Sequence, residues 1–307
     1  MGPPVNGTGP SDGTLAWLLE PSDPSPRYLT LTRVLGRPAD APDVRASQRA
    51  IPDTGPARDI LMAQYPQGYW MHPGIGYSPR YRATLWQILI LAQLGMPRSE
   101  SLDRAVAHLF EANQRGDGAF RASREGGDTP IGLNGSLLWA LEVLGYGEEP
   151  RVRDAWSWLA GEMASRRLRV TGSGGTVPVW GAVRALWAAN AVPPPRRAGP
   201  VERVSSAAVD LLLDHPPEPG ESDPRWFRLT FPLTRAPDLL QWAEVLVAAG
   251  CGDAPCLSEA RAWLQRRRRP DGAWPLERVP GKLWADFGAV GEPNKWITVR
   301  ALAADLG

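Results

Sequence analysis

Two aspartates stand at the start of predicted helices whose other residues are almost all apolar. Asp238 lies in TRAPDLLQW, and Asp128 comes directly before Thr129 and Pro130. Burial raises the pKa of a carboxylic acid, so such a side chain can stay protonated and serve as a general acid. The same position suits a helix N-cap, where a carboxylate accepts hydrogen bonds from the first turn. Both roles are open for the two aspartates.

Tryptophan is the unusual residue of this chain, with 14 copies against 5 Phe and 6 Tyr. The face of an indole ring attracts a cation by about 0.5–2 kcal/mol. We select Trp86, Trp180 and Trp296 as candidates to line a substrate cavity, because each lies in an apolar segment. The alternative is that these side chains fill the hydrophobic core, as most buried Trp do.

Polar side chains also stand at the starts of the apolar segments. A cationic rim for an anionic ligand such as a diphosphate is predicted from Tyr81, Arg82, Arg235 and Lys295. The alternative is that these cations pair with neighbouring acids such as Glu292 and Asp238. Asn134 is a further candidate for substrate binding, because a buried amide needs hydrogen-bond partners. It could instead bond Gln87 across the protein.

These residues lie on helical segments of two kinds that alternate along the chain. Segments that are apolar nearly all round cover about 25–36, 79–95, 129–145, 177–192, 232–250 and 293–306. Amphipathic segments with one apolar stripe cover 56–64, 99–114, 150–165, 200–214 and 256–268. A helix that is apolar on all sides must be buried, and one with a single stripe covers it. The chain is therefore predicted to be all-α, with about six inner and five to six outer helices.

A helix-stop motif, Q-x3-G-x-aromatic, recurs along the chain. It occurs at 64–70 and 114–120, and a third copy at 268–274 has Arg in place of Gln. A Gly after a helix adopts the left-handed conformation that ends the last turn. The Gln can bond backbone groups that the helix end leaves unpaired. Repeats at such intervals indicate an array of helical pairs.

We expect the pairs to close into a ring, because the inner segments are too apolar for the exposed concave face of an open solenoid. Residues 40–51 are available to complete the outer layer. The prediction is one α/α toroid domain over residues 13–307, preceded by a mobile Gly/Pro-rich tail at 1–12. Its central cavity should be lined by the N-terminal halves of the inner helices.

Charge and hydropathy exclude some partners. With 34 basic and 33 acidic residues the net charge is +1, which argues against nucleic-acid binding. The first residues do not read as a signal peptide, and no apolar run is long enough to span a bilayer. We expect a cytoplasmic protein, with Arg266–Arg269 as the segment that could touch a membrane surface. Cys251 and Cys256 are expected to be a reduced pair.

Together these features resemble the α/α toroids of terpenoid cyclases and protein prenyltransferases. The resemblance rests on the Q-x3-G-x-W/F motif, the alternation of inner and outer helices and the Trp content, and it spans about Leu15 to Leu306. The segments 77–95, 231–240 and 293–302 look especially like a bacterial single-toroid subgroup described as squalene-cyclase-like or prenyltransferase-like. The resemblance implies an enzyme that cyclises or transfers a hydrophobic isoprenoid in the central cavity.

The chain departs from the signature motifs of both families. Triterpene cyclases carry D-x-D-D-T at the start of an inner helix, where this chain has EGGDT at 125–129. The central proton donor of that motif is therefore replaced by Gly127. Protein prenyltransferases hold zinc with Asp, Cys and His, and neither cysteine here opens an inner helix. We expect no zinc and no resident cofactor, with Mg²⁺ entering only together with a diphosphate.

These observations are compatible with three functions. In the first, the chain is an isoprenoid enzyme in which Asp238 or Asp128 supplies the acid. In the second, it is a non-catalytic toroid that binds a lipid or a protein partner after losing the acid and zinc motifs. In the third, it acts on a carbohydrate with Asp128 and Asp238 as paired carboxylates, although the dry inner helices disfavour such a substrate. We favour the first.

Overall fold

The computed structural model describes residues 10–123, 130–165 and 176–304, with side chains from residue 179 onward in the last range. Regular structure within these ranges is helical, apart from three isolated β-bridges. The predicted all-α fold is confirmed. None of the described helices is long and apolar enough to cross a membrane.

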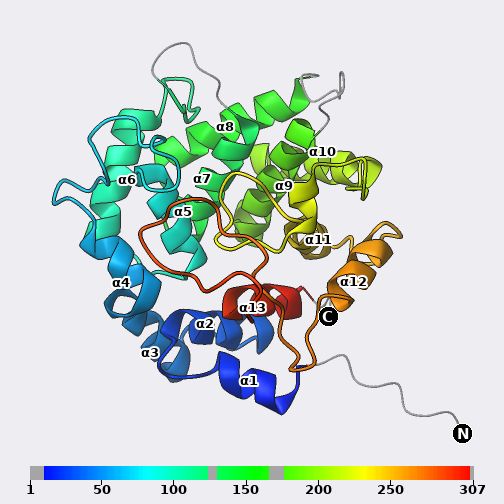
Figure 1. Cartoon of the computed structure of the whole chain (residues 1–307). Helices are drawn as coiled ribbons and strands as arrows, with labels where there is room; N and C mark the ends of the chain where they lie inside the picture. Colours follow the sequence, from blue (N-terminus) through cyan, green and yellow to red (C-terminus); the bar gives the residue numbers. More distant parts are fainter. Residues whose placement is uncertain (1–9, 124–129, 166–175, 305–307) are drawn as a thin grey trace, which may run out of the picture.

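The apolar segments form the inner layer of a ring (Figure 1). They are α2 (Pro24–Leu29) with its π-helical extension η1 (Thr30–Val34), α5 (Thr84–Gln93), α7 (Ile131–Val143), α9 (Thr176–Ala191), α11 (Leu239–Ala248) and α13 (Lys295–Ala303). Contacts join α5 to α7, α7 to α9, α9 to α11, α11 to α13, and α13 back to α2. Between α2 and α5, the backbone of Gly95 lies against the Tyr28 ring. The layer is thus the closed toroid that the sequence predicts.

The amphipathic segments form the outer layer. It comprises α1 (Asp12–Leu18), α3 (Pro42–Ala50), α4 (Gly55–Met62), α6 (Glu100–Asn113), α8 (Pro150–Ala164), α10 (Pro200–Asp214) and α12 (Leu257–Gln265), with short 3-10 turns at η2 (Ile51–Asp53), η4 (Pro194–Arg196) and η5 (Pro224–Phe227). In α6 the stripe of Leu102, Ala105, Val106, Leu109 and Phe110 is buried, as its spacing predicts.

Two inner helices begin later than the sequence pattern indicates. Helix α5 begins at Thr84 rather than near 79, because Tyr81 has φ 68°, a left-handed conformation outside a right-handed helix. Helix α11 begins at Leu239 rather than near 232. There Pro237 disfavours helical geometry at the residue before it, and Asp238 caps the helix that follows.

The two intact helix stops share one hydrogen-bond scheme. The amide of Gln114 donates to the carbonyl of Gly118 at 3.0 Å and to that of Arg151 in α8 at 2.7 Å. Gln64 does the same with Gly68 and with Ser101 in α6, at 3.2 and 3.0 Å. Each Gln therefore closes its own turn and ties that turn to the next outer helix.

The third stop packs against the first helix of the chain. Gly272 has φ 84°, and a Cβ there would lie 2.5 Å from the hydroxyl oxygen of Thr14 in α1. That hydroxyl donates to the carbonyl of Asp271 at 2.9 Å. Arg268 replaces the Gln and bonds only the carbonyl of Gly272 among the described residues. The outer layer is closed at this point by the two ends of the chain.

The lumen of the ring is occupied by the chain itself. Residues 228–238 and 276–294, yellow and orange to red, run across the ring (Figure 1). The two segments are held together by the backbone of Leu229, which accepts from Glu277 and Arg278. Gln93 of α5 anchors Leu233 by accepting from its N–H at 2.7 Å and donating to its carbonyl at 2.8 Å. The predicted central cavity is therefore largely filled.

Candidate functional site

Asp238 is fully buried and caps α11. One carboxylate oxygen accepts from the N–H of Gln241 at 2.8 Å, and the other accepts from the N–H of Thr230 at 3.0 Å. Arg300 of α13 donates to both oxygens, at 2.8 and 3.2 Å. Every one of these neighbours is a hydrogen-bond donor, as an N-cap carboxylate requires. Asp238 is therefore the N-cap of α11. Its predicted function as a general acid stays a prediction, and these contacts do not support it.

Arg300 also binds a second carboxylate, Glu244 of α11. Its Nη2 lies 2.6 Å, and its Nε 3.0 Å, from one oxygen of Glu244. The Glu244 side chain is 21% exposed, whereas that of Asp238 is 0% exposed. Burial raises the pKa of Glu244 and outweighs the attraction of Arg300, and the nearby charge of Asp238 acts in the same direction. The pKa of the Glu244 carboxyl group is thus higher than that of an exposed glutamate.

Aromatic rings surround Glu244 and Arg300 in the lumen. Trp139 of α7 and Trp187 of α9 stack with their centroids 3.7 Å apart. Phe231 and Trp296 stack with centroids 5.1 Å apart and an interplanar angle of 6°. These residues line a cavity of about 30 Å³ together with Leu29, Arg33, Gln93, Leu233, Glu244, Val299 and Arg300. That volume admits about one or two water molecules.

A buried cation of α9 lies beside this cluster. Arg184 is 0% exposed; it donates to the carbonyl of Ala236 at 3.1 Å, and its guanidinium lies 5.1 Å from the Trp187 ring centroid. Within the described part of the chain, its Nε and Nη1 have no hydrogen-bond partner, and neither amide atom of the buried Gln241 side chain has one. Burial lowers the pKa of Arg184 to about 9, so the group still carries its charge at neutral pH. Buried donors without a partner can still bind a ligand group that carries an acceptor atom.

Asn134 and Gln87 bond the backbone rather than each other. The side chain of Asn134 accepts from the N–H of Phe120 at 2.7 Å and donates to the carbonyl of the same residue at 3.0 Å. Gln87 donates to the carbonyl of Tyr81 at 2.9 Å. The hydroxyls of Thr84 and Thr298 accept from Trp70 and Trp274 in the other two helix stops. Asn134 therefore holds the aromatic residue of its own stop, and its proposed contact with substrate stays a prediction.

The predicted cationic rim is dispersed. Lys295 forms ion pairs with Glu20 and Asp23, not with Glu292. The guanidinium of Arg82 stacks 3.7 Å from the Trp284 ring centroid, whereas Arg235 is exposed to solvent. Asp238, one of the acids named as an alternative partner for these cations, pairs with Arg300 instead.

The remaining predicted residues lie above the cluster or outside the described residues. Trp86 is buried and donates to the carbonyl of Tyr77 at 2.7 Å, and its ring packs edge-on against Tyr81. Trp180 is buried under Arg225, whose guanidinium lies 4.4 Å from its ring centroid. Of the predicted aromatic residues, Trp296 is the one placed in the lumen cavity. Asp128 lies outside the described residues.

Metal ligands do not cluster in the part of the chain that the structure describes, where no group of three or more His, Cys, Asp or Glu could hold an ion. Cys251 and Cys256 are both free thiols, as expected for a reduced pair.

The sequence pattern does not select Glu244 or Arg300. Each is nevertheless a charged residue within an apolar inner helix, LLQWAEVLVA in one case and KWITVRALA in the other. Arg184 in TVPVWGAVRALWAANA carries the same signal. A search for charged residues inside the apolar helices would have found all three, because such charges are costly to bury without partners.

Comparison with known proteins gives a likeness of shape. No protein-family model matches the chain, and no curated protein sequence matches it. Among solved structures, it is similar to apo type II terpene cyclase MstE from Scytonema, with 14% identity and a TM-score of 0.32, covering 81% of this chain and 94% of that chain. A complex of an MstE variant with its substrate geranylgeranyl dihydroxybenzoate gives 13% identity and a TM-score of 0.30 over the same shares.

Proposed function

We propose that this toroid is an isoprenoid-handling enzyme that cyclises its substrate by protonation, with Glu244 as the proton donor. The observation that carries the proposal is a carboxyl group of raised pKa that lines one small cavity together with two stacked aromatic pairs. A buried carboxylic acid is the type of group that can protonate a carbon–carbon double bond. The rings of Trp139, Trp187, Phe231 and Trp296 would then stabilise the carbocation, by about 0.5–2 kcal/mol for each favourable ring face.

The substrate gains one proton and loses one proton in such a reaction. Glu244 gives its proton to one carbon of a double bond, and the other carbon becomes cationic. The electrons of a second double bond attack that cation and form the ring bond. A neighbouring carbon then returns a proton to the Glu244 carboxylate, which ends the reaction and restores the acid. The product is an isomer of the substrate. The carboxylate left on Glu244 is stabilised by Arg300, which already donates to it.

Asp238 acts through Arg300 in this scheme. It binds the Nη1 and Nη2 atoms of the guanidinium, whereas Glu244 binds Nε and Nη2, and its negative charge adds to the rise in the pKa of Glu244. We therefore treat Asp238 as a positioning residue rather than as the acid. Prenyl transfer from a diphosphate is less well supported, because Lys295 is already neutralised by two carboxylates and Arg82 is stacked on Trp284.

Substrate binding in the lumen requires residues 229–238 to move. Ligand sites usually enclose about 300–1,000 Å³, whereas this cavity encloses about 30 Å³. The segment is held by Gln93 at Leu233, by Arg184 at Ala236 and by Asp238 at Thr230. When the segment withdraws, Arg184 loses the only acceptor it has among the described residues and becomes free to bind a polar group of the substrate.

The test is incubation of the purified chain with squalene, C10 to C20 prenyl diphosphates and geranylgeranyl dihydroxybenzoate, followed by gas chromatography with mass detection. We expect a cyclic isomer of one substrate, and a loss of about 100-fold or more in turnover for Glu244→Gln. Glu111→Gln, an exposed acid on outer helix α6, is the matched control and should keep full turnover. Full turnover by Glu244→Gln would refute its role. Binding without turnover would instead support the non-catalytic toroid.

Asp238→Asn separates positioning from acid chemistry. Asparagine can still cap α11, but the charge that raises the pKa of Glu244 is removed. Activity should persist at low pH, and its decline with rising pH should begin at a lower pH than in the wild type. Complete loss at every pH in a folded protein would make Asp238 the acid and overturn the assignment to Glu244.

A further inference from the structure

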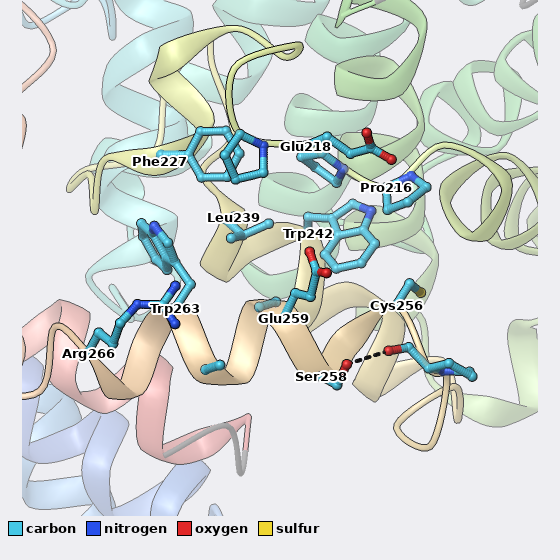
Figure 2. A pocket seen from close by; sticks show the side chains of 15 residues that line it. Pro216, Glu218, Phe227, Leu239, Trp242, Cys256, Ser258, Glu259, Trp263 and Arg266 are labelled. Atoms are coloured by element: carbon cyan, nitrogen blue, oxygen red, sulfur yellow. Dashed lines mark hydrogen bonds between the residues drawn. The ribbon is translucent and has the colours of Figure 1, made fainter.

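A second cavity lies outside the lumen, where the outer layer opens between α10 and α12. It has a volume of about 480 Å³, within the usual range for small-ligand sites of about 300–1,000 Å³. Figure 2 shows it between α12 and the segment 216–227, with α11 forming its floor. We call it the α12 groove. None of the residues that line the lumen cavity lines this groove, so the inference below is independent of the proposed function.

The floor and walls of the α12 groove are aromatic and aliphatic. Leu239 and Trp242 come from α11, Phe227 from the end of η5, and Trp263 from α12. Phe227 and Trp263 meet edge to face with centroids 6.3 Å apart. Arg267 covers one face of Trp263, at 3.8 Å from the ring centroid. An apolar ring system of ligand size would bury itself against such a surface.

One polar atom of the floor has no partner. Trp242 is 1% exposed, and its Nε1 forms no hydrogen bond with any of the described residues. Figure 2 shows the indole within the groove, with its nitrogen edge toward Pro216 and Glu218. An indole N–H can only donate, and a buried donor without an acceptor is destabilising. The groove therefore offers a donor to a ligand that carries an acceptor atom.

Two carboxylates of the α12 groove are also free. Glu259 projects from α12 between Leu239 and Trp242, and Glu218 lies at the opposite rim. Neither forms an ion pair within the described residues, and the lining contains one cation, Arg266. Carboxylates beside aromatic faces favour an organic cation, through Coulomb attraction and through the ring quadrupole.

We infer that the α12 groove binds a small aromatic or aliphatic amine that also carries a hydrogen-bond acceptor. The ammonium group lies beside Glu259, the apolar body covers Leu239 and Trp242, and the acceptor takes the Trp242 N–H. The free thiol of Cys256 lines the same groove, whereas Cys251 does not. Bound ligand should therefore shield one cysteine and leave the other as an internal reference.

The probe is 4-methoxyphenethylamine, which combines an ammonium, an arene and an ether oxygen. Binding is measured by titration calorimetry and by protection of Cys256 from alkylation, followed by mass spectrometry. We expect binding and selective protection of Cys256. The neutral 4-methoxyphenylethanol should bind about fivefold more weakly or worse, because it lacks the charge that Glu259 recognises. Phenethylamine, which has no acceptor for Trp242, should also bind more weakly.

Matched variants complete the test. Glu259→Gln should weaken binding of the amine about fivefold and leave binding of the neutral analogue unchanged. Trp242→Phe should make the affinities for the probe and for phenethylamine equal. Glu202→Gln, an exposed acid of α10, and Glu244→Gln in the lumen should both bind as the wild type does. Equal affinity for the amine and its neutral analogue, or unchanged binding by Glu259→Gln, would overturn the inference. The inference would also be overturned if millimolar probe gave neither a heat of binding nor protection of Cys256 from alkylation.

Discussion

The lumen and the α12 groove are built from similar side chains but use them differently. Each has Trp in its walls and a glutamate from an inner or outer helix. In the lumen Glu244 is bonded by Arg300, and the cavity measures about 30 Å³. In the groove Glu259 has no ion pair among the described residues, and the cavity measures about 480 Å³. Charges in the lumen hold the inner helices together, whereas charges in the groove are left available to a ligand.

The packing of the helices explains this difference. Helices α7 and α9 approach so closely that a Cβ on Gly135 would lie 2.6 Å from the backbone of Arg184. Residues 228–238 then fill the remaining space between the inner helices. In the outer layer, residues 215–238 lie between α10 and α12 in the chain, and α12 stands apart from α10 (Figure 1). Space is thus left outside the ring rather than inside it.

The largest change in stability is expected from the substitution Arg300→Met in the lumen. It leaves Asp238 and Glu244 without their shared cation, and breaking a buried ion pair by removing one partner costs about 3–5 kcal/mol. The free energy of unfolding from urea denaturation should fall by that amount. Arg269→Met, which removes an exposed pair with Asp271, should change it by less than about 1 kcal/mol. Similar losses in both variants would mean that the lumen charges do not hold the ring.

A smaller effect is expected from Gln93→Leu. The substitution leaves both the N–H and the carbonyl of the buried Leu233 unpaired, which should cost about 1–3 kcal/mol. Hydrogen exchange at residues 229–238 should accelerate more than exchange in α7 or α9. Gln265→Leu, at an exposed position of α12, serves as the control. Uniform acceleration throughout the chain would show global destabilisation instead of release of this segment.

The smallest effect concerns pH. The folded state holds the Glu244 proton more tightly than the unfolded chain, whose pKa is near the usual 4.5. The stability that this proton contributes is present below that value and is lost as pH rises through the higher folded pKa. Glu244→Gln, which is neutral throughout, should therefore gain stability relative to wild type as the pH rises above about 4.5. Glu259→Gln on the groove rim should change stability by less than about 0.5 kcal/mol, and an equal pH trend in both would refute the assignment.

Much of the fold could be predicted because each helix carries its own signal. The stripe of α6 and the all-apolar composition of α5 follow from periodicity and need no tertiary information. The starts of α5 and α11 could not be predicted from periodicity, since the left-handed Tyr81 and the cap Asp238 interrupt apolar stretches that look continuous. Local patterns also give no sign that residues 229–238 enter the lumen.

The candidate site was harder to predict because partner choice is a long-range property. Lys295 reaches Glu20 and Asp23 from the other end of the chain, and Asp238 is taken by Arg300 of α13. Sequence neighbours such as Glu292 and Arg235 are exposed instead. Trp296 lines the lumen cavity, and its contact with a substrate stays a prediction.

Closure of the ring by its two ends has a consequence for synthesis of the protein. Helix α2 packs against α13, and α1 is tied to Asp271, so the first helices lack their partners until the last ones have been made. Translation proceeds at about 5–20 residues per second. An apolar edge around Leu29 would therefore stay uncovered on the ribosome for a period on the order of tens of seconds. Chaperones that bind nascent chains would find their target at the beginning of this chain, not at its end.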